Sequence, residues 1–237
     1  MKSIQLVLLF SNLLLTSFLG LFAQEKEDYL ITYDSIIGKE NLAVTNGLFH
    51  YNNYRINDNK DIYYSSEKYI AGSLNYLGQI YYDLFLKYDA YNDELVYRSS
   101  GNSEKTGINL IKSNVNSFKI NELNFVNLDK IESENKDFIK GFYEEKIKNN
   151  TLSLYIKHSK SKREIFIGKN ILVEFSDESE FIVYKDKKFN RITSKKSVIN
   201  EFPDKKKMIN EYYKNNSELK KKNKTLFFTS LFKNISQ

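Results

Sequence analysis

The 237-residue sequence contains no cysteine, no tryptophan, one proline and nine glycines. The absence of cysteine excludes a disulfide scaffold, an iron–sulfur cluster, a thiolate zinc site and a cysteine nucleophile. Only two histidines are present, His50 and His158, which argues against a histidine-rich metal site or a histidine relay. With so little glycine and proline, asparagine and aspartate must supply most of the turns.

Hydrophobic residues make up 41% of the chain and aromatic residues 15%, which argues against disorder. This length is sufficient for one domain with a buried core. Without thiols, the stability of that domain must come from packing and hydrogen bonding alone.

Residues 1–23 have the pattern of a secretory signal peptide: Lys2 gives a positive start, residues 4–22 form an uncharged apolar run, and Ala23 precedes a polar stretch. A membrane anchor is the alternative, since about 20 apolar residues can span a bilayer. The serine, asparagine and threonine residues within the run favour cleavage after Ala23. We therefore expect export to the periplasm, the outer-membrane periphery or the extracellular space, with residues 24–237 as a single domain without a transmembrane span.

Residues 24–190 are predicted to form a β-rich body. Tyr82, Leu84, Leu86 and Tyr88 alternate with other residues at the period of a half-buried strand. Turn-forming residues at 89–93 then lead into a second apolar run. Together, these segments predict successive hairpins in an antiparallel meander. Short apolar stretches continue to residue 184, at the spacing of a sandwich or a barrel-like fold. The charged segment 158–164 is expected to connect two strands and to expose His158.

Residues 191–237 are predicted to form a basic helical segment with two or three short amphipathic helices. Ser194 can cap a helix with Val198, Ile199 and Phe202 on one face, and helical spacing recurs after Pro203 and after residue 225. Short helices are marginally stable alone, so these need a surface to dock on.

Charge is unevenly distributed along the chain. Residues 185–237 contain 15 lysines and arginines and 5 acidic residues, a net charge of +10, which leaves residues 24–184 with −5. Because exported proteins rarely meet nucleic acid, anionic lipid or acidic glycan is the more plausible partner for this end; the alternative is that these lysines line solvated helix faces. The candidate anionic-surface contacts are Lys205, Lys206, Lys207, Lys220, Lys221 and Lys222.

The sequence contains no recognisable catalytic motif. It lacks G-x-S-x-G, the P-loop, G-x-G-x-x-G and H-E-x-x-H, so we nominate no catalytic residue, cofactor or metal ligand. The acidic stretches 57–61 and 89–94 could hold Ca²⁺, although turn chemistry explains both more simply. Glu144 and Glu145 would point to opposite faces of a strand and so make a poor hydrolytic pair. His50 is interpreted as a packed histidine.

Tyrosine is abundant around the central meander, and its ring can stack on a sugar while its hydroxyl stays solvated. Such strand tyrosines more often pack against the sheet. The candidate ligand-stacking residues are Tyr81, Tyr82, Tyr88 and Tyr91.

Residues 72–96 contain the pattern G-x-L-x-Y-x-G-x-x-Y followed by L-x-Y-D-x-Y-x-D-x-L. This pattern resembles that of uncharacterised exported proteins of the Bacteroidetes. The resemblance implies export and a β-rich body, and it carries no activity or site residues.

Three functional hypotheses follow. The leading one is a non-enzymatic envelope protein with a binding or assembly role, with an envelope protein, a glycan or an anionic lipid as partner. The alternatives are a glycan-binding module or glycan-acting enzyme that uses tyrosines and carboxylates, and peripheral membrane association through the basic C-terminal segment.

Overall fold

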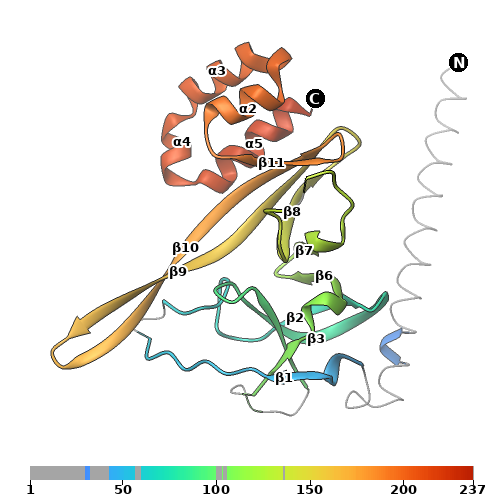
Figure 1. Ribbon diagram of the computed structural model, residues 1–237, viewed down its shortest axis with the longest axis vertical. Helices are drawn as coiled ribbons and strands as arrows, with labels where there is room; N and C mark the ends of the chain where they lie inside the picture. Colours follow the sequence, from blue (N-terminus) through green and yellow to red (C-terminus); the bar gives the residue numbers. More distant parts are fainter. Residues whose placement is uncertain are drawn as a thin grey trace, which may run out of the picture.

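The computed structural model in Figure 1 describes residues 30–32, 43–56, 60–99, 103, 106–135 and 137–236. The predicted signal peptide and its cleavage point lie outside these residues. The strands are β1 (Gly47–Phe49), β2 (Ile70–Tyr76), β3 (Gln79–Asp89), β4 (Glu94–Arg98), β5 (Ile108–Leu110), β6 (Val115–Ile120), β7 (Leu123–Asn127), β8 (Phe142–Lys148), β9 (Ser153–Ile167), β10 (Asn170–Lys185) and β11 (Lys188–Ile192). The α-helices are α2 (Lys195–Glu201), α3 (Lys206–Asn215), α4 (Ser217–Lys222) and α5 (Lys224–Ile235). The short 3₁₀ helices are η2 (Ala43–Thr45), η3 (Lys112–Asn114), η4 (Leu128–Lys130) and η5 (Pro203–Lys205).

The eleven strands of the described residues form one sheet in the order β1-β5-β4-β3-β2-β6-β7-β8-β9-β10-β11. Every neighbouring pair is antiparallel. The chain runs from β2 to β5 toward one edge, returns to pair β6 with the other side of β2, and then runs to the opposite edge at β11. The predicted mainly β, antiparallel fold with short C-terminal helices is thus confirmed.

Two-residue turns close several hairpins without proline. Both residues have positive φ at Leu77–Gly78 (53° and 86°), Asn121–Glu122 (49° and 61°) and Asp186–Lys187 (50° and 59°). This is the backbone of a type I′ turn, whose twist matches that of the flanking strands. Only one of the six residues is glycine, so this chain places ordinary side chains in the left-handed region to turn its strands.

The sheet curls on itself. Four strand-to-strand steps separate β3 from β8, which would amount to about 19 Å in a flat sheet. The ring centroids of Tyr88 on β3 and Phe142 on β8 nevertheless lie only 6.1 Å apart. The rings of Phe118 and Phe125, on the strands between them, stack at 4.8 Å. The apolar face of the sheet therefore closes around an aromatic core.

The C-terminal helices cover one face of β9, β10 and β11 (Figure 1). Ser194 begins α2 as predicted, because its side chain accepts a hydrogen bond from the backbone N–H of Ser197 in a capping box. Phe228 of α5 packs on Phe181 of β10 with ring centroids 4.5 Å apart. The docking surface that these short helices need is thus the sheet itself. No helix among the described residues has both the length and the apolar character needed to cross a bilayer.

Strands β9 and β10 form a long hairpin, paired continuously from Ser153 and Tyr184 to Ile167 and Asn170. Its distal half runs away from the helices (Figure 1). The prediction that residues 158–164 are a connection is therefore wrong, since they belong to β9. Their charges are compatible with a strand because opposite charges face each other across the pair: Lys160 contacts Asp177 at 2.9 Å, and Arg163 contacts Glu174 at 2.7 Å.

Residues of the N-terminal half fix the middle of this hairpin. The backbone N–H of Val173 donates to the carbonyl of Arg55, and that of Phe175 donates to the carbonyl of Lys60. Val173 and Phe175 are buried with Ile62 and Tyr63. The hairpin is thus held to the body along its middle section, while its end extends further.

Candidate functional site

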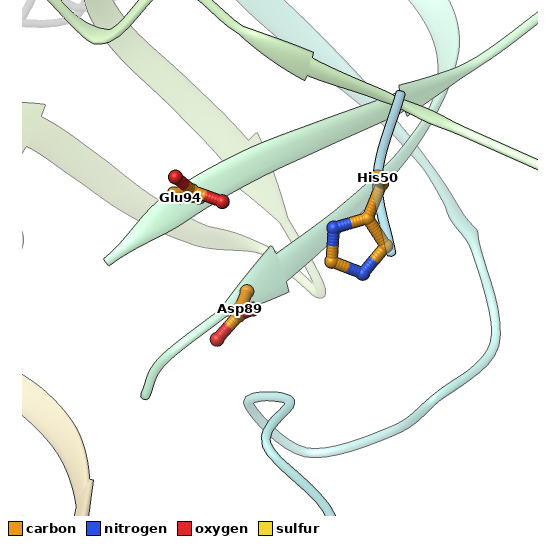
Figure 2. Close-up of side chains that lie close together, drawn as sticks. All are labelled: His50, Asp89 and Glu94. Carbon is orange, nitrogen blue, oxygen red and sulfur yellow. The ribbon is translucent and has the colours of Figure 1, made fainter. Parts of the chain in front are cut away.

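A polar cluster lies on the face of β3 and β4 opposite the apolar core (Figure 2). Strand alternation turns Leu86 and Tyr88 into the core and places Asp89 on the other face. Glu94 of β4 is paired directly with Asp89, and His50, which follows β1, reaches the same place. We call these three residues the His50 cluster.

Hydrogen bonds define the tautomer of His50. The Nδ2 atom of Asn109 donates to Oε2 of Glu94 at 2.6 Å, so its Oδ1 atom accepts from Nδ1 of His50 at 2.7 Å. The hydroxyl of Tyr63 then donates to Nε2 of His50 at 2.8 Å. Burial lowers the pKa of His50 below its ordinary value of 6.5, and the nearby charge of Lys87 acts in the same direction. The imidazole is therefore neutral at neutral pH, as these bonds require.

Asp89 is fully buried and holds the turn between β3 and β4. Its Oδ1 atom accepts from the backbone N–H groups of Tyr91 and Asn92 at 3.0 and 2.9 Å. Its Oδ2 atom accepts from Nδ2 of Asn92 at 2.8 Å. This is the geometry of an Asx turn, so the turn interpretation of this acidic stretch holds at Asp89. Residues 57–59 of the other acidic stretch lie outside the described residues.

The His50 cluster has the composition of a metal centre but a poor fit to one. One ligand atom from each residue lies within 4.8 Å of the other two, and His, Asp and Glu are common metal ligands. Both imidazole nitrogens, however, already have hydrogen-bond partners, and Asp89 is engaged by the turn. A cation would have to break these bonds close to the positive charge of Lys87. The cluster is better explained as a network that attaches the segment after β1 to β3, β4 and β5.

A second polar cluster centres on Glu144 of β8. Glu144 is buried, with 2% of its surface exposed. Oε1 of Glu144 accepts from Nζ of Lys146, and its Oε2 atom lies against Nε2 of His158, both at 2.7 Å. The ring of Tyr64 packs against that of His158 in a tilted arrangement, with centroids 4.6 Å apart. Burial alone would raise the pKa of Glu144, but the hydrogen bonds from His158 and Lys146 outweigh it and lower the pKa. The expectation that His158 is exposed is therefore wrong, because β9 carries it into this cluster.

The four candidate stacking tyrosines do not gather on one exposed surface. Tyr81 and Tyr88 are buried in the aromatic core, beyond the reach of a ligand. Tyr82 and Tyr91 are half-buried, and the ring of Tyr91 packs edge-on against Phe175. Glu144 and Glu145 likewise bind different lysines, Lys146 and Lys148, rather than forming a hydrolytic pair.

The predicted basic surface is exposed in large part. Lys206 and Lys207 lie on α3, Lys220 to Lys222 form the end of α4, and all five are exposed, whereas Lys205 in η5 is half-buried. Lys221 is paired with Glu218 at 3.0 Å.

The sequence predicts two strand candidates at residues 165–167 and 171–175, and the structure places both toward the end of the long hairpin, which is exposed. Phe166 is 74% exposed, Ile167 52% and Ile171 51%. We call residues 165–172 the hairpin tip. The available signal was an apolar run interrupted by Gly168, Lys169 and Asn170, which places a turn between the two apolar stretches.

The hairpin tip is apolar on both faces. Cross-strand partners share a face, so Phe166 and Ile171 lie on one side of the ribbon. Ile165, Leu172 and Ile167 lie on the other. The cover provided by Tyr54, Ile56, Ile62 and Tyr63 ends between Val173, which is buried, and Ile171, which is not. The tip thus presents an unpaired apolar end on a supported stem.

Comparison with known proteins gives no relative: no family model, no curated protein and no solved structure matches this chain.

Proposed function

We propose that this chain is a non-enzymatic, exported binding protein of the cell envelope, related to the Bacteroidetes proteins that it resembles. In this proposal, the protein docks on its partner through the hairpin tip. The observation that carries the proposal is the exposure of Phe166, Ile167 and Ile171 at the end of a projecting ribbon. Removal of exposed apolar surface from water is the main driving force of protein association.

The polar clusters support a binding role over an enzymatic one. Catalysis needs a nucleophile, an acid or a base that faces a space where a substrate can sit. In the described residues, the side chains of His50, Asp89 and Glu144 are instead bonded to neighbouring protein groups. Turnover of a glycan or peptide by the purified mature protein would contradict this part of the proposal.

The hairpin is also suited to docking because it is stiff. The pairs Lys160–Asp177 and Arg163–Glu174 clamp its two strands, and Val173 and Phe175 hold it to the body. A preformed ribbon loses little conformational entropy when it binds.

The test compares two double variants in the native cell. Phe166→Ser/Ile171→Ser removes apolar surface from the tip, and Leu48→Ser/Phe49→Ser removes a similar amount from β1, where both residues are exposed. We expect the amount of the tip variant retained in the envelope fraction to fall at least about tenfold relative to the wild type, whereas the β1 variant remains bound. Equal retention of the tip variant and the wild type would refute docking through the tip.

Export is tested by the N-terminus of protein recovered from cells. The sequence predicts a mature chain that begins at Gln24. Mass spectrometry of the intact protein should show this end, and a retained leader would contradict the exported state.

Peripheral association with anionic lipid through the basic helices is a second candidate, favoured by the exposed lysines of α3 and α4. Replacement of Lys206, Lys207, Lys220, Lys221 and Lys222 by glutamine should then abolish co-sedimentation with anionic vesicles at low salt. Binding that does not weaken at high salt would reject this electrostatic mechanism.

A further inference from the structure

We propose that the partner of the hairpin tip is a protein with a two-walled apolar cleft that carries a carboxylate at its closed end, an inference that rests on the proposed function. The tip would enter this cleft end-on. The shape and the charge of the tip carry the argument independently of each other.

The shape requires two walls. Phe166 and Ile171 face one side of the ribbon, and Ile167 faces the other. A groove with a single wall would cover one set and leave the other in water. A protein layer that packs face to face on a β-ribbon lies about 10 Å from it, which sets the distance to each wall. The three residue pairs of the tip extend roughly 10 Å along the ribbon, which sets the depth. The expected cleft is therefore about 20 Å between wall backbones and about 10 Å deep.

The charge sits at the apex. Gly168 and Lys169 form the turn, with positive φ (61°) at Gly168 and not at Lys169, as in a type II′ turn. Near the tip, Lys162 lies 3.7 Å from Glu164, and Arg163 lies 2.7 Å from Glu174. Within the described part of the chain, no carboxylate forms an ion pair with Lys169. Its charge is thus the one that a partner can neutralise.

The same lysine argues against a bilayer as the occupant. Lys169 is at the outermost end of the hairpin, so insertion of the apolar pairs would carry its ammonium group deeper than Phe166 or Ile171. A charge in the hydrocarbon region is costly, whereas a carboxylate at the closed end of a protein cleft would compensate it.

The stem sets how far the tip can enter. Val173 is buried against Ile56, Ile62 and Tyr63, whereas Ile171, two residues nearer the apex, is 51% exposed. Residues 165–172 therefore project beyond this cover, and they are the part of the hairpin that can enter a cleft.

The experiment places a photo-crosslinking amino acid at Phe166 or at Ile167, on opposite faces, in the full chain in its native cells. We expect both positions to form an adduct with the same protein, and a probe at Leu48 on β1 to form no such adduct. Lys169→Glu should reduce the adduct at least about tenfold, while Lys169→Arg retains it. These residues are exposed, so the melting temperature should not change and serves as the folding control.

The partner identified in this way then allows a charge exchange. With the purified pair, lysine in place of the cleft carboxylate should weaken binding of the wild-type chain and restore binding of Lys169→Glu. Adducts from one face only, adducts with lipid, or Lys169→Glu binding as well as wild type would each overturn the cleft proposal. In those cases the proposed function survives if Phe166→Ser/Ile171→Ser still detaches from the envelope, and it fails together with the cleft if that variant stays bound.

Discussion

His158 on β9 and Glu144 on β8 are joined at 2.7 Å between Nε2 and Oε2, inside the curve of the sheet. Lys146 contacts the other oxygen of the same carboxylate at 2.7 Å. A buried carboxylate held by two partners stabilises the fold only while it is ionised. The connection between the two halves of the sheet is therefore sensitive to pH at a defined residue.

Glu144→Gln should reduce the free energy of unfolding at pH 7 by about 2–3 kcal/mol, because Lys146 and His158 lose their charged partner. The pKa of Glu144 is lowered in the folded state from its ordinary value of 4.5. Its contribution is thus complete above pH 4.5 and is lost as the pH falls through the lower, folded-state pKa. Urea unfolding between pH 7 and pH 3 should show the wild type and the variant converging in acid.

Glu145→Gln is the matched control for this prediction. Glu145 is the next residue of β8, and it pairs with Lys148, which is largely exposed. The side chain of Glu145 is 13% exposed, but that of Lys148 is 67% exposed, so solvent screens this pair more than the pairs of Glu144. We therefore expect a smaller loss, of about 1 kcal/mol. If the two variants lose equal stability, the special role of Glu144 is refuted.

His50 should produce a second pH window, separate from that of Glu144. Burial lowers its folded-state pKa below 6.5, so below pH 6.5 the unfolded chain binds more protons than the folded chain. The free energy of unfolding therefore falls as the pH drops from 6.5 toward the folded-state pKa. His50→Gln should flatten this region. Proton NMR can follow the imidazole directly, since only two histidines need to be assigned; a folded-state pKa above 6.5 would show the neutral network to be incorrect.

Divalent cations should leave the stability unchanged. A metal bound at the His50 cluster with a Kd of about 10 µM would add about 2.7 kcal/mol at 1 mM, which would raise the melting temperature by several degrees. Since the imidazole nitrogens and Asp89 are already hydrogen-bonded, we expect a shift of less than about 1 °C with Zn²⁺ or Ca²⁺. A larger shift that His50→Gln abolishes would identify a metal site here.

The strands and helices were largely predictable because the apolar period is strong, and Ser194 marks the start of α2 by its capping chemistry. The side of the sheet on which each side chain lies was less predictable. A register shift between Gly72 and Leu74 leaves Tyr82 and Asp83 opposite one residue of β2, and Asp83 has positive φ (52°). This bulge reverses the alternation, so Tyr81 is buried in place of Tyr82. The periodicity of one strand cannot reveal this bulge, because the bulge is a feature of the pairing between β2 and β3.

The clusters were unpredictable for a related reason. Residues 158–164 are rich in charge, and charge in one strand is tolerated only when the neighbouring strand supplies the opposite sign. Asp177 and Glu174 do so from β10, but the register of that pairing is set by the whole hairpin. The position of His158 beside Glu144 depends in addition on the β8–β9 register, in which Glu144 pairs with Ile156 and a shift occurs between Glu145 and Ile147, and the sequence alone does not fix that register.

Attachment of the C-terminal helices to the sheet should depend on Phe228. This residue is 1% exposed and packs on Phe181 of β10, so Phe228→Ala should cost about 3–5 kcal/mol, as other buried phenylalanine truncations do. Short helices that lose their docking surface unfold locally, and limited proteolysis should then cleave within residues 194–236 before the strands are attacked. Leu226→Ala is the control in the same helix, because Leu226 is 49% exposed. Equal protease sensitivity of the two variants would mean that the helices are held by contacts other than this aromatic pair.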